Sequence, residues 1–414
     1  YLIGIDPYYW TKHARNILQN GYPGDRLVDG EWYDDHMLAP WGRFVPPDMF
    51  HAYFLAYSFK IAHLFDSSTT LESITVYNPA ILMGLATIIA FFLGRRMGGN
   101  ITGFFSALIV AIHQSILVRT IGGFADTDPY QILFPLLILW MFLESFNAVL
   151  KWTSKWKYLL PILTGLLIGF YSFVWGGWWY ILLYVLTAGS IYLVIYFYPA
   201  WKEKGFFGAF TGTQFSKIIL TLFIIFLAAV PSILFFSGPR VFFELNQFVQ
   251  GFIEIHEVKE SNVWPNVYIT VAEQNEGSIT SAISNMGGRF IFYFSILGLL
   301  LPLLFRKVRH DNNINIKYPI LILIWLATTT WAVTRGIRFT LMMVPPFAIG
   351  FGMSVTFIGF YLKRLVAFLN VSNKWYDITS TIIAIFIGLS LLGMVPYQNN
   401  GLWPVSYGIS RTGA

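Results

Sequence analysis

The sequence predicts an all-α protein that crosses a membrane many times, and its composition is the first reason. Of 414 residues, 56% are hydrophobic and only 12% are charged, whereas a soluble domain carries about 25% charged residues. The mean hydropathy is +0.59. A globule of this size would have too few polar side chains to cover its surface, so we expect the apolar runs to face lipid.

Long apolar runs are the second reason, because a helix needs roughly 17–25 apolar residues to cross a bilayer. One run, Met49–Phe65, is not counted as a span, because it is of marginal length and contains His51, Lys60 and His63; we expect it to lie along the membrane surface. Some long runs could break in two, so we expect about 10–12 spans. Ten runs qualify: Ser73–Leu93, Ile101–Val118, Tyr130–Leu150, Tyr158–Val174, Trp178–Tyr198, Ile218–Phe236, Phe290–Phe305, Tyr318–Val333, Phe339–Tyr361 and Ile378–Val395.

The basic residues predict the orientation of these spans. With residues 1–47 outside and ten alternating spans, the inside loops hold fifteen of the 27 Lys and Arg, and the short outside loops hold only Arg119, Arg335 and Arg338. Lys and Arg collect on the cytoplasmic side of membrane proteins. We therefore expect an integral protein of the cell membrane, whose basic loops contact anionic lipid and not nucleic acid.

This orientation divides the chain into five regions. Loops as long as the third region are usually functional or disordered. The regions are a first external loop (1–47), the first part of the transmembrane bundle (48–236), a long mobile external loop (237–288), the second part of the bundle (289–396) and the start of an external C-terminal segment (397–414).

Acidic residues gather on the predicted external side. Asp6 lies in "GIDPYYW", and Asp126 and Asp128 lie two residues apart in "GGFADTDPYQILF". Hard divalent cations prefer oxygen ligands, and Mg²⁺ often takes one or two carboxylates together with phosphate oxygens. The alternative for each of these acids is a helix N-cap, with the carboxylate on free backbone N–H groups.

The long external loop adds a further acid in "YITVAEQNEG", where Thr270 and Glu273 stand three residues apart. Taken alone, this T-x-x-E pattern is typical of a helix capping box. Two arginines, Arg119 and Arg338, lie at span ends on the same side. Guanidinium groups suit phosphate and carboxylate recognition, although arginines at span ends also simply reach toward water.

Cysteine is absent, so disulfides and thiolate metal sites are excluded and any metal must use oxygen or imidazole ligands. The seven histidines are scattered, and His36 in "YDDHM" is expected to be structural. Ionisable groups near lipid usually have a functional reason. Carboxylates and arginines from distant parts of the chain, all on one face, therefore predict a site for a divalent metal.

The motifs together resemble the catalytic subunit of oligosaccharyltransferase, in its archaeal single-subunit form (dolichyl-phosphooligosaccharide–protein glycotransferase). The stretches that carry the resemblance run in the family's order across nearly the whole chain. They are "GIDPYYW", "GEWYDDHMLAPWGR", "LVRTIGGFADTDPYQILFPLL", "WGGWWY", "ITVAEQ" and "RGIRFTLMMVPPFAIGFG". The resemblance implies a membrane fold of the GT-C type and transfer of an oligosaccharide from a polyprenyl (dolichyl) phosphate or pyrophosphate carrier to Asn in N-x-[ST].

The resemblance also implies a role for each site residue. Its partners would be the lipid-linked oligosaccharide and an acceptor protein. Asp6, Asp126, Asp128 and Glu273 would be catalytic and would hold Mg²⁺ or Mn²⁺, and Asp6 and Glu273 would also engage the acceptor carboxamide. Arg119, Arg338 and Thr270 would bind substrate, with Arg338 on the lipid pyrophosphate.

Two departures from the family pattern mark the chain as an expected fragment. The family has a span before the position of Asp6, and a soluble C-terminal domain with a W-W-D-Y-G motif that this sequence does not contain. Two alternatives stay open. One is another GT-C glycosyltransferase that uses a polyprenyl-phosphate sugar. The other is a membrane transporter, although transporters place such charges near the bilayer midplane and not at span ends.

Overall fold

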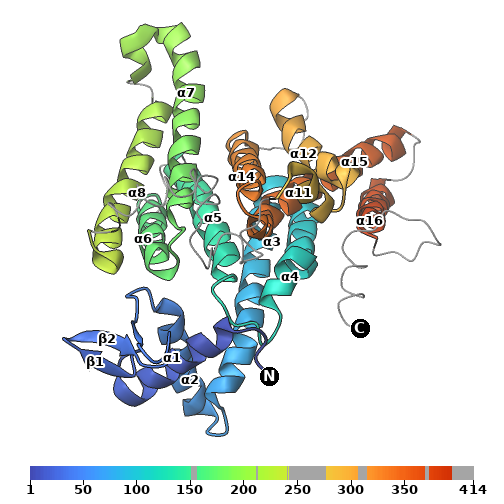
Figure 1. Ribbon diagram of the computed structural model, residues 1–414. Helices are drawn as coiled ribbons and strands as arrows, with labels where there is room; N and C mark the ends of the chain where they lie inside the picture. Colours follow the sequence, from blue (N-terminus) through green and yellow to red (C-terminus); the bar gives the residue numbers. More distant parts are fainter. Residues whose placement is uncertain are drawn as a thin grey trace.

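The computed structural model is a bundle of helices with a small folded unit at one end (Figure 1). It describes residues 1–150, 156–210, 213–239, 241, 277–305, 315–368 and 373–393. The predicted all-α class is confirmed for the bundle. A three-stranded antiparallel sheet in the N-terminal region was not predicted.

The N-terminal unit combines two helices with this sheet. Helix α1 (Asp6–Asn20) ends at Gly21, which adopts a left-handed conformation, and α2 (Phe50–Phe65) matches the predicted surface helix. The strands β1 (Arg26–Val28), β2 (Glu31–Asp34) and β3 (Arg43–Phe44) pair in chain order. Ala14 and Ile17 of α1 pack on Met49, just before α2, and on Ala52 and Leu55 of α2, so the N-terminal unit has a core of its own.

Helix α3 (Leu71–Ile112) contains both of the first two predicted spans. Its backbone breaks at Gly98 and Gly99. A Cβ added at Gly94 would lie 2.3 Å from Ser106 Oγ, and one at Gly103 would lie 2.7 Å from the Phe91 carbonyl. Twelve residues of straight helix would separate such pairs by about 18 Å. The two halves of α3 therefore run back along each other as a hairpin, with glycines at their contact.

The remaining predicted runs are also helical. Helices α7 and α15 run several residues past the predicted ends of their spans, and α8 and α16 begin earlier than predicted. The bounds are α4 (Gln114–Thr120), α5 (Tyr130–Leu150), α6 (Leu159–Val174), α7 (Trp179–Phe210), α8 (Thr213–Ser237), α11 (Ile279–Asn285), α12 (Arg289–Leu304), α14 (Lys317–Val333), the 3₁₀ turn η2 (Ile337–Phe339), α15 (Thr340–Phe368) and α16 (Asn373–Leu391).

Length and hydropathy select a smaller set of spans than the sequence pattern did. Within the described ranges, five helices are long and apolar enough to cross a membrane, or six if α11 and α12, which meet at 88°, form one broken span. They are α3, α5, α7, α8 and η2–α15, whereas α6, α14 and the apolar part of α16 are shorter. These helices make the chain an integral membrane protein. The number of crossings stays a prediction.

Small residues set the helix contacts that shape the bundle. A Cβ at Gly169 of α6 would lie 2.1 Å from Ser232 Oγ of α8, and one at Gly298 of α12 would lie 2.2 Å from the Gly350 carbonyl of α15. Such close approach is how helices associate in lipid, where no hydrophobic force draws them together. Helix α15 is the most enclosed of the five spans, with 89% of its apolar window buried.

Candidate functional site

The loop between α4 and α5 carries the two acids of the D-x-D pattern. Asp128 is buried at 1% exposure, whereas Asp126 is half-buried. Gln131 Nε2 donates a hydrogen bond to Asp128 Oδ1 at 3.0 Å. The second oxygen, Oδ2, is buried and accepts no hydrogen bond from the residues that the structure describes, although Arg119 Nη1 lies 3.8 Å from it. A carboxylate oxygen that is shielded from water and only loosely paired is suited to receive a cation.

Electrostatics link Asp128 to the other predicted site residues. The pKa of Asp128 is raised to about 6, mainly by burial and also by the negative charges of Asp126 and Asp6, while Arg338 and Arg119 act in the opposite direction. These charges come from the start of α1, the end of α4, the α4–α5 loop and η2. The five described site residues of the sequence prediction thus influence one another at the same end of the bundle.

The N-terminal backbone explains how Asp6 reaches this end. Ile3 N–H donates to the Gly123 carbonyl at 2.9 Å, so residues before α1 lie along the α4–α5 loop (Figure 1). Gly123 has a φ of +93°, and a Cβ there would lie 2.6 Å from the Tyr1 carbonyl. Only glycine combines that conformation with that approach.

The structure excludes the helix N-cap role for one of the predicted site acids, Asp6. The N-cap of α1 is Ile5, and Asp6 is the first residue inside the helix, so Asp6 is not the N-cap. Its charge still favours a helix start through the macrodipole. Asp126 Oδ1 accepts from the neighbouring Thr127 N–H at 2.7 Å. Thr270 and Glu273 lie outside the described residues, so their capping-box alternative and their site roles stay predictions.

Two residues beside Asp126 were missed by the sequence analysis. Trp10 Nε1 donates to Asp126 Oδ1 at 3.1 Å, and its ring meets His51 edge-on. His51 is buried, with Nδ1 2.8 Å from the Tyr130 hydroxyl. Burial lowers the pKa of His51 to about 4, so the ring is neutral at pH 7. Trp10 follows Asp6 by one helical turn, which was the available signal.

The donor set fits a hard divalent cation. Carboxylate oxygens dominate it, and Asp128, whose Oδ2 is only loosely paired, is the most buried of these carboxylates. A tighter grouping occurs elsewhere, however. Within the described ranges, three ligand atoms within 4.8 Å of one another occur at Asp25, Asp34 and His36, and not at Asp6, Asp126 and Asp128. Coordination of a single ion by those last three acids therefore stays a prediction.

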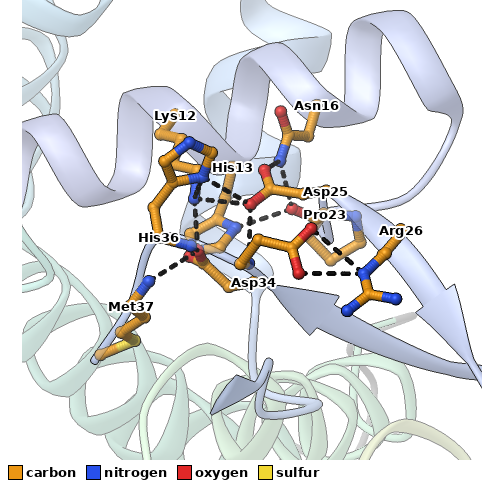
Figure 2. A network of polar contacts seen from close by, with 10 residues as sticks. Lys12, His13, Asn16, Pro23, Asp25, Arg26, Asp34, His36 and Met37 are labelled. Atoms are coloured by element: carbon orange, nitrogen blue, oxygen red, sulfur yellow. Dashed lines mark hydrogen bonds and ion pairs between the residues drawn. The ribbon is translucent and has the colours of Figure 1, made fainter. Parts of the chain in front are cut away.

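That second cluster ties α1 to the sheet (Figure 2). Lys12 Nζ lies 3.0 Å from Asp25 Oδ2 and 2.5 Å from Asp34 Oδ1. Burial alone would raise the pKa of Asp25, but hydrogen bonds from His36, Lys12 and Asn16 hold that pKa well below its usual range. Burial lowers the pKa of His13, which lies behind Asp34. His36 thus has the structural contacts that the sequence analysis expected.

The family model and the related sequences point to the same protein family. The family model "Oligosaccharyl transferase STT3, N-terminal" matches residues 1–396. A dolichyl-phosphooligosaccharide-protein glycotransferase of Methanococcus voltae is 30% identical over 94% of this chain, and the chain spans only 44% of that relative.

Solved structures agree in fold. The archaeal oligosaccharyltransferase of Archaeoglobus fulgidus, in complex with an inhibitory peptide and a dolichol-phosphate, superposes with a TM-score of 0.59 at 17% identity, covering 96% of this chain and 53% of that one. An Archaeoglobus fulgidus oligosaccharyltransferase in complex with Zn and sulfate gives a TM-score of 0.55 at 18% identity, covering 94% of this chain and 49% of that one. Since the family model matches almost the whole sequence, the chain belongs to the oligosaccharyl transferase STT3 family.

Proposed function

We propose that this chain carries the catalytic face of an oligosaccharyltransferase. The reaction would move an oligosaccharide from a polyprenyl (dolichyl) phosphate or pyrophosphate carrier to the Asn of an N-x-[ST] sequon in an acceptor protein. Family membership and the glycotransferase names of the relatives support the reaction class. The single observation that carries the proposal is the buried, loosely paired Asp128 carboxylate, with Asp126, Asp6, Arg119 and Arg338 acting on it.

The proposed metal ligands are Asp6, Asp126, Asp128 and Glu273. The oxygen donors favour Mg²⁺ or Mn²⁺, and the Archaeoglobus enzyme was crystallised with Zn. When bound, the cation would supply Lewis-acid stabilisation of the charge that develops on the departing phosphate. Trp10 and Gln131 hold one oxygen each of Asp126 and Asp128, so their other oxygens are oriented before the ion arrives.

The substrate roles follow from charge and exposure. Arg338 and Arg119 would bind the phosphate groups of the carrier and stabilise the leaving group electrostatically. The acceptor amide nitrogen is a poor nucleophile, because its lone pair is delocalised into the carbonyl. Asp6 is exposed at the start of α1, and with Glu273 it could accept the amide N–H groups and weaken that conjugation. Thr270 would contact the acceptor from the same loop.

The site would face the exterior. The predicted orientation puts the basic loops inside and the acids outside. In the fold, α1 and the α4–α5 loop lie at the end of the bundle opposite the C-terminal part of α7, where Lys202 and Lys204 come just before the break at Gly205 (Figure 1). This separation of charge supports an external active face.

The experiment is glycan transfer by the full-length protein. Purified enzyme is given a lipid-linked oligosaccharide and a fluorescent sequon peptide, with and without Mn²⁺. We expect Asp126→Ala and Asp128→Ala each to lower kcat/KM by roughly 10²-fold or more. The control is Asp29→Asn, an exposed acid with φ of +53°, which Asn also tolerates. Normal transfer by either Ala variant would refute the assigned site.

The same assay separates the alternatives. Another GT-C glycosyltransferase would consume a polyprenyl-phosphate sugar and leave the sequon peptide unmodified. A transporter would transfer no sugar to any acceptor. Transfer to Asn, abolished when the sequon Ser or Thr is replaced by Ala, is the outcome that the proposed function requires.

A further inference from the structure

His51 has no role in the proposed reaction, yet it is buried beside the acids of the α4–α5 loop. It lies in the first turn of α2 and is 1% exposed. Its Nδ1 lies 2.8 Å from the hydroxyl of Tyr130, the first residue of α5. The backbone of Ala125 bonds to the ring as well, and this bond raises the pKa that burial lowers. One side chain of α2 thus holds the loop just before Asp126 and just after Pro129.

These contacts define which ring nitrogen carries the proton. A backbone group that raises the pKa of a histidine is a carbonyl that accepts from the ring, since a backbone N–H would favour the unprotonated nitrogen. Nε2 therefore carries the proton that faces Ala125, and Nδ1 accepts from the Tyr130 hydroxyl. The neutral ring holds the loop without competing with a cation for the carboxylates, as the permanent charge of an arginine would.

Tyr130 transmits this hold to the backbone of the loop. Its side chain is 1% exposed, and its ring packs edge-on against Phe50 of α2 at 5.5 Å, so the hydroxyl has little freedom. The Tyr130 N–H donates to the Thr127 carbonyl at 3.1 Å, and the Gln131 N–H donates to the Asp128 carbonyl at 3.0 Å. Fixing Tyr130 therefore fixes the turn that contains Asp128.

A second route leads from His51 through Trp10 to the other acid of the loop. The two rings meet edge-on, with 5.3 Å between their centroids and an interplanar angle of 87°. Trp10 Nε1 donates to Asp126 Oδ1 at 3.1 Å. The imidazole thus supports the indole whose N–H orients the Asp126 carboxylate.

We propose that His51 is a positioning residue of the metal site, and that it holds the loop acids in place through Trp10 and Tyr130 without touching the ion. This inference rests on the proposed function, since it assumes that Asp126 and Asp128 bind a divalent cation. Groups that hold metal ligands from behind orient them, and their loss lowers metal affinity by roughly 10–100-fold. A histidine that only stabilised the packing of α2 would leave the affinity unchanged when replaced.

The test is Mn²⁺ binding by the full-length protein in detergent, with no substrate present and the free ion measured by electron paramagnetic resonance. We expect His51→Phe, which keeps a ring against Trp10 but removes both hydrogen bonds, to weaken binding by about tenfold. His51→Asn should recover most of the affinity, because its Oδ1 accepts from Tyr130 in place of Nδ1. Tyr130→Phe deletes the hydroxyl alone and should weaken binding to a similar degree, so it provides the test even if His51→Phe does not fold.

Matched variants separate positioning from a loss of stability. His63→Phe makes the same change at an exposed histidine of α2 and should bind Mn²⁺ like the wild type. Because His51 and Tyr130 share one hydrogen bond, the double Phe variant should bind no more weakly than His51→Phe alone. In glycan transfer the defect of His51→Phe should shrink as Mn²⁺ is raised, whereas the defect of Asp128→Ala should persist.

The binding data distinguish a failure of this inference from a failure of the proposed function. If folded His51→Phe and Tyr130→Phe both bind Mn²⁺ like the wild type while Asp128→Ala does not, the metal site stands and the positioning role is wrong. If the wild type binds no Mn²⁺, or binds it no better than Asp128→Ala, the assigned metal site is wrong and the positioning role falls with it.

Discussion

Asp128 gives a quantitative prediction, because its buried carboxylate should destabilise the metal-free fold at neutral pH. Its pKa is raised from 3.8 to about 6, with burial as the main cause. The folded state then binds more protons than the unfolded state between these values, so stability falls as pH rises through them. At 1.36 kcal/mol per pKa unit, the loss at pH 8 is about 3 kcal/mol. At pH 4 most of that loss is absent.

The substitution Asp128→Asn isolates this effect. Asn keeps the shape and the Oδ1 acceptor for Gln131 but does not titrate. We expect the variant to gain on the wild type by about 2.4 kcal/mol in unfolding free energy between pH 4 and pH 8. The gain appears as a higher unfolding temperature in detergent with chelator, followed by tryptophan fluorescence. Adding Mg²⁺ or Mn²⁺ at pH 8 should then stabilise the wild type and leave the variant unchanged.

Comparison with Asp29→Asn controls for the other titrating groups, because that acid is exposed. The reasoning is refuted if Asp128→Asn and the wild type show the same pH dependence. It is equally refuted if the variant is the less stable protein at pH 8, because the Asp128 carboxylate would then be well compensated without a cation.

Three other perturbations test the support of the site and the topology. Trp10→Phe removes the 3.1 Å hydrogen bond to Asp126 and should raise the Mn²⁺ concentration for half-maximal transfer by about tenfold. The control Trp32→Phe, in β2, should leave that concentration unchanged. Gly123→Ala places a Cβ 2.6 Å from the Tyr1 carbonyl at positive φ and should lower the free energy of unfolding by about 1–3 kcal/mol. The control Gly122→Ala places a Cβ 3.5 Å from its nearest atom and should be tolerated. Mass spectrometry should find the sequons at Asn100 and Asn370 unglycosylated, because the predicted topology puts both inside.

The helices were predictable because their signal is local. An apolar run in lipid can satisfy its backbone only as a helix, so α6 and α14 begin and end within one residue of their predicted bounds. The hairpin in α3 was predictable as two spans, since "RRMGGN" interrupts the apolar pattern. The small sheet was not, because its strands have only two to four residues and no clear alternation.

The position of the described acids at one end of the bundle was predictable, but their contacts were not. Topology alone placed Asp6, Asp126 and Asp128 on one face, and the structure places them at one end of the bundle. The contacts that prepare them are long-range, as with Trp10 and Asp126, 116 residues apart. Burial of Asp128 depends on packing around the loop. No window of sequence contains such information, and the Lys12 cluster is hidden for the same reason.

The most direct test of the central assignment is to locate the catalytic cation itself. Crystals of the full-length protein soaked in Mn²⁺ would be measured at the manganese absorption edge, in a buffer where the enzyme glycosylates a sequon peptide. We expect an anomalous peak bounded by the carboxylates of Asp126 and Asp128, with Asp6 beside it. A peak elsewhere alone, or no peak while transfer proceeds, would contradict the account.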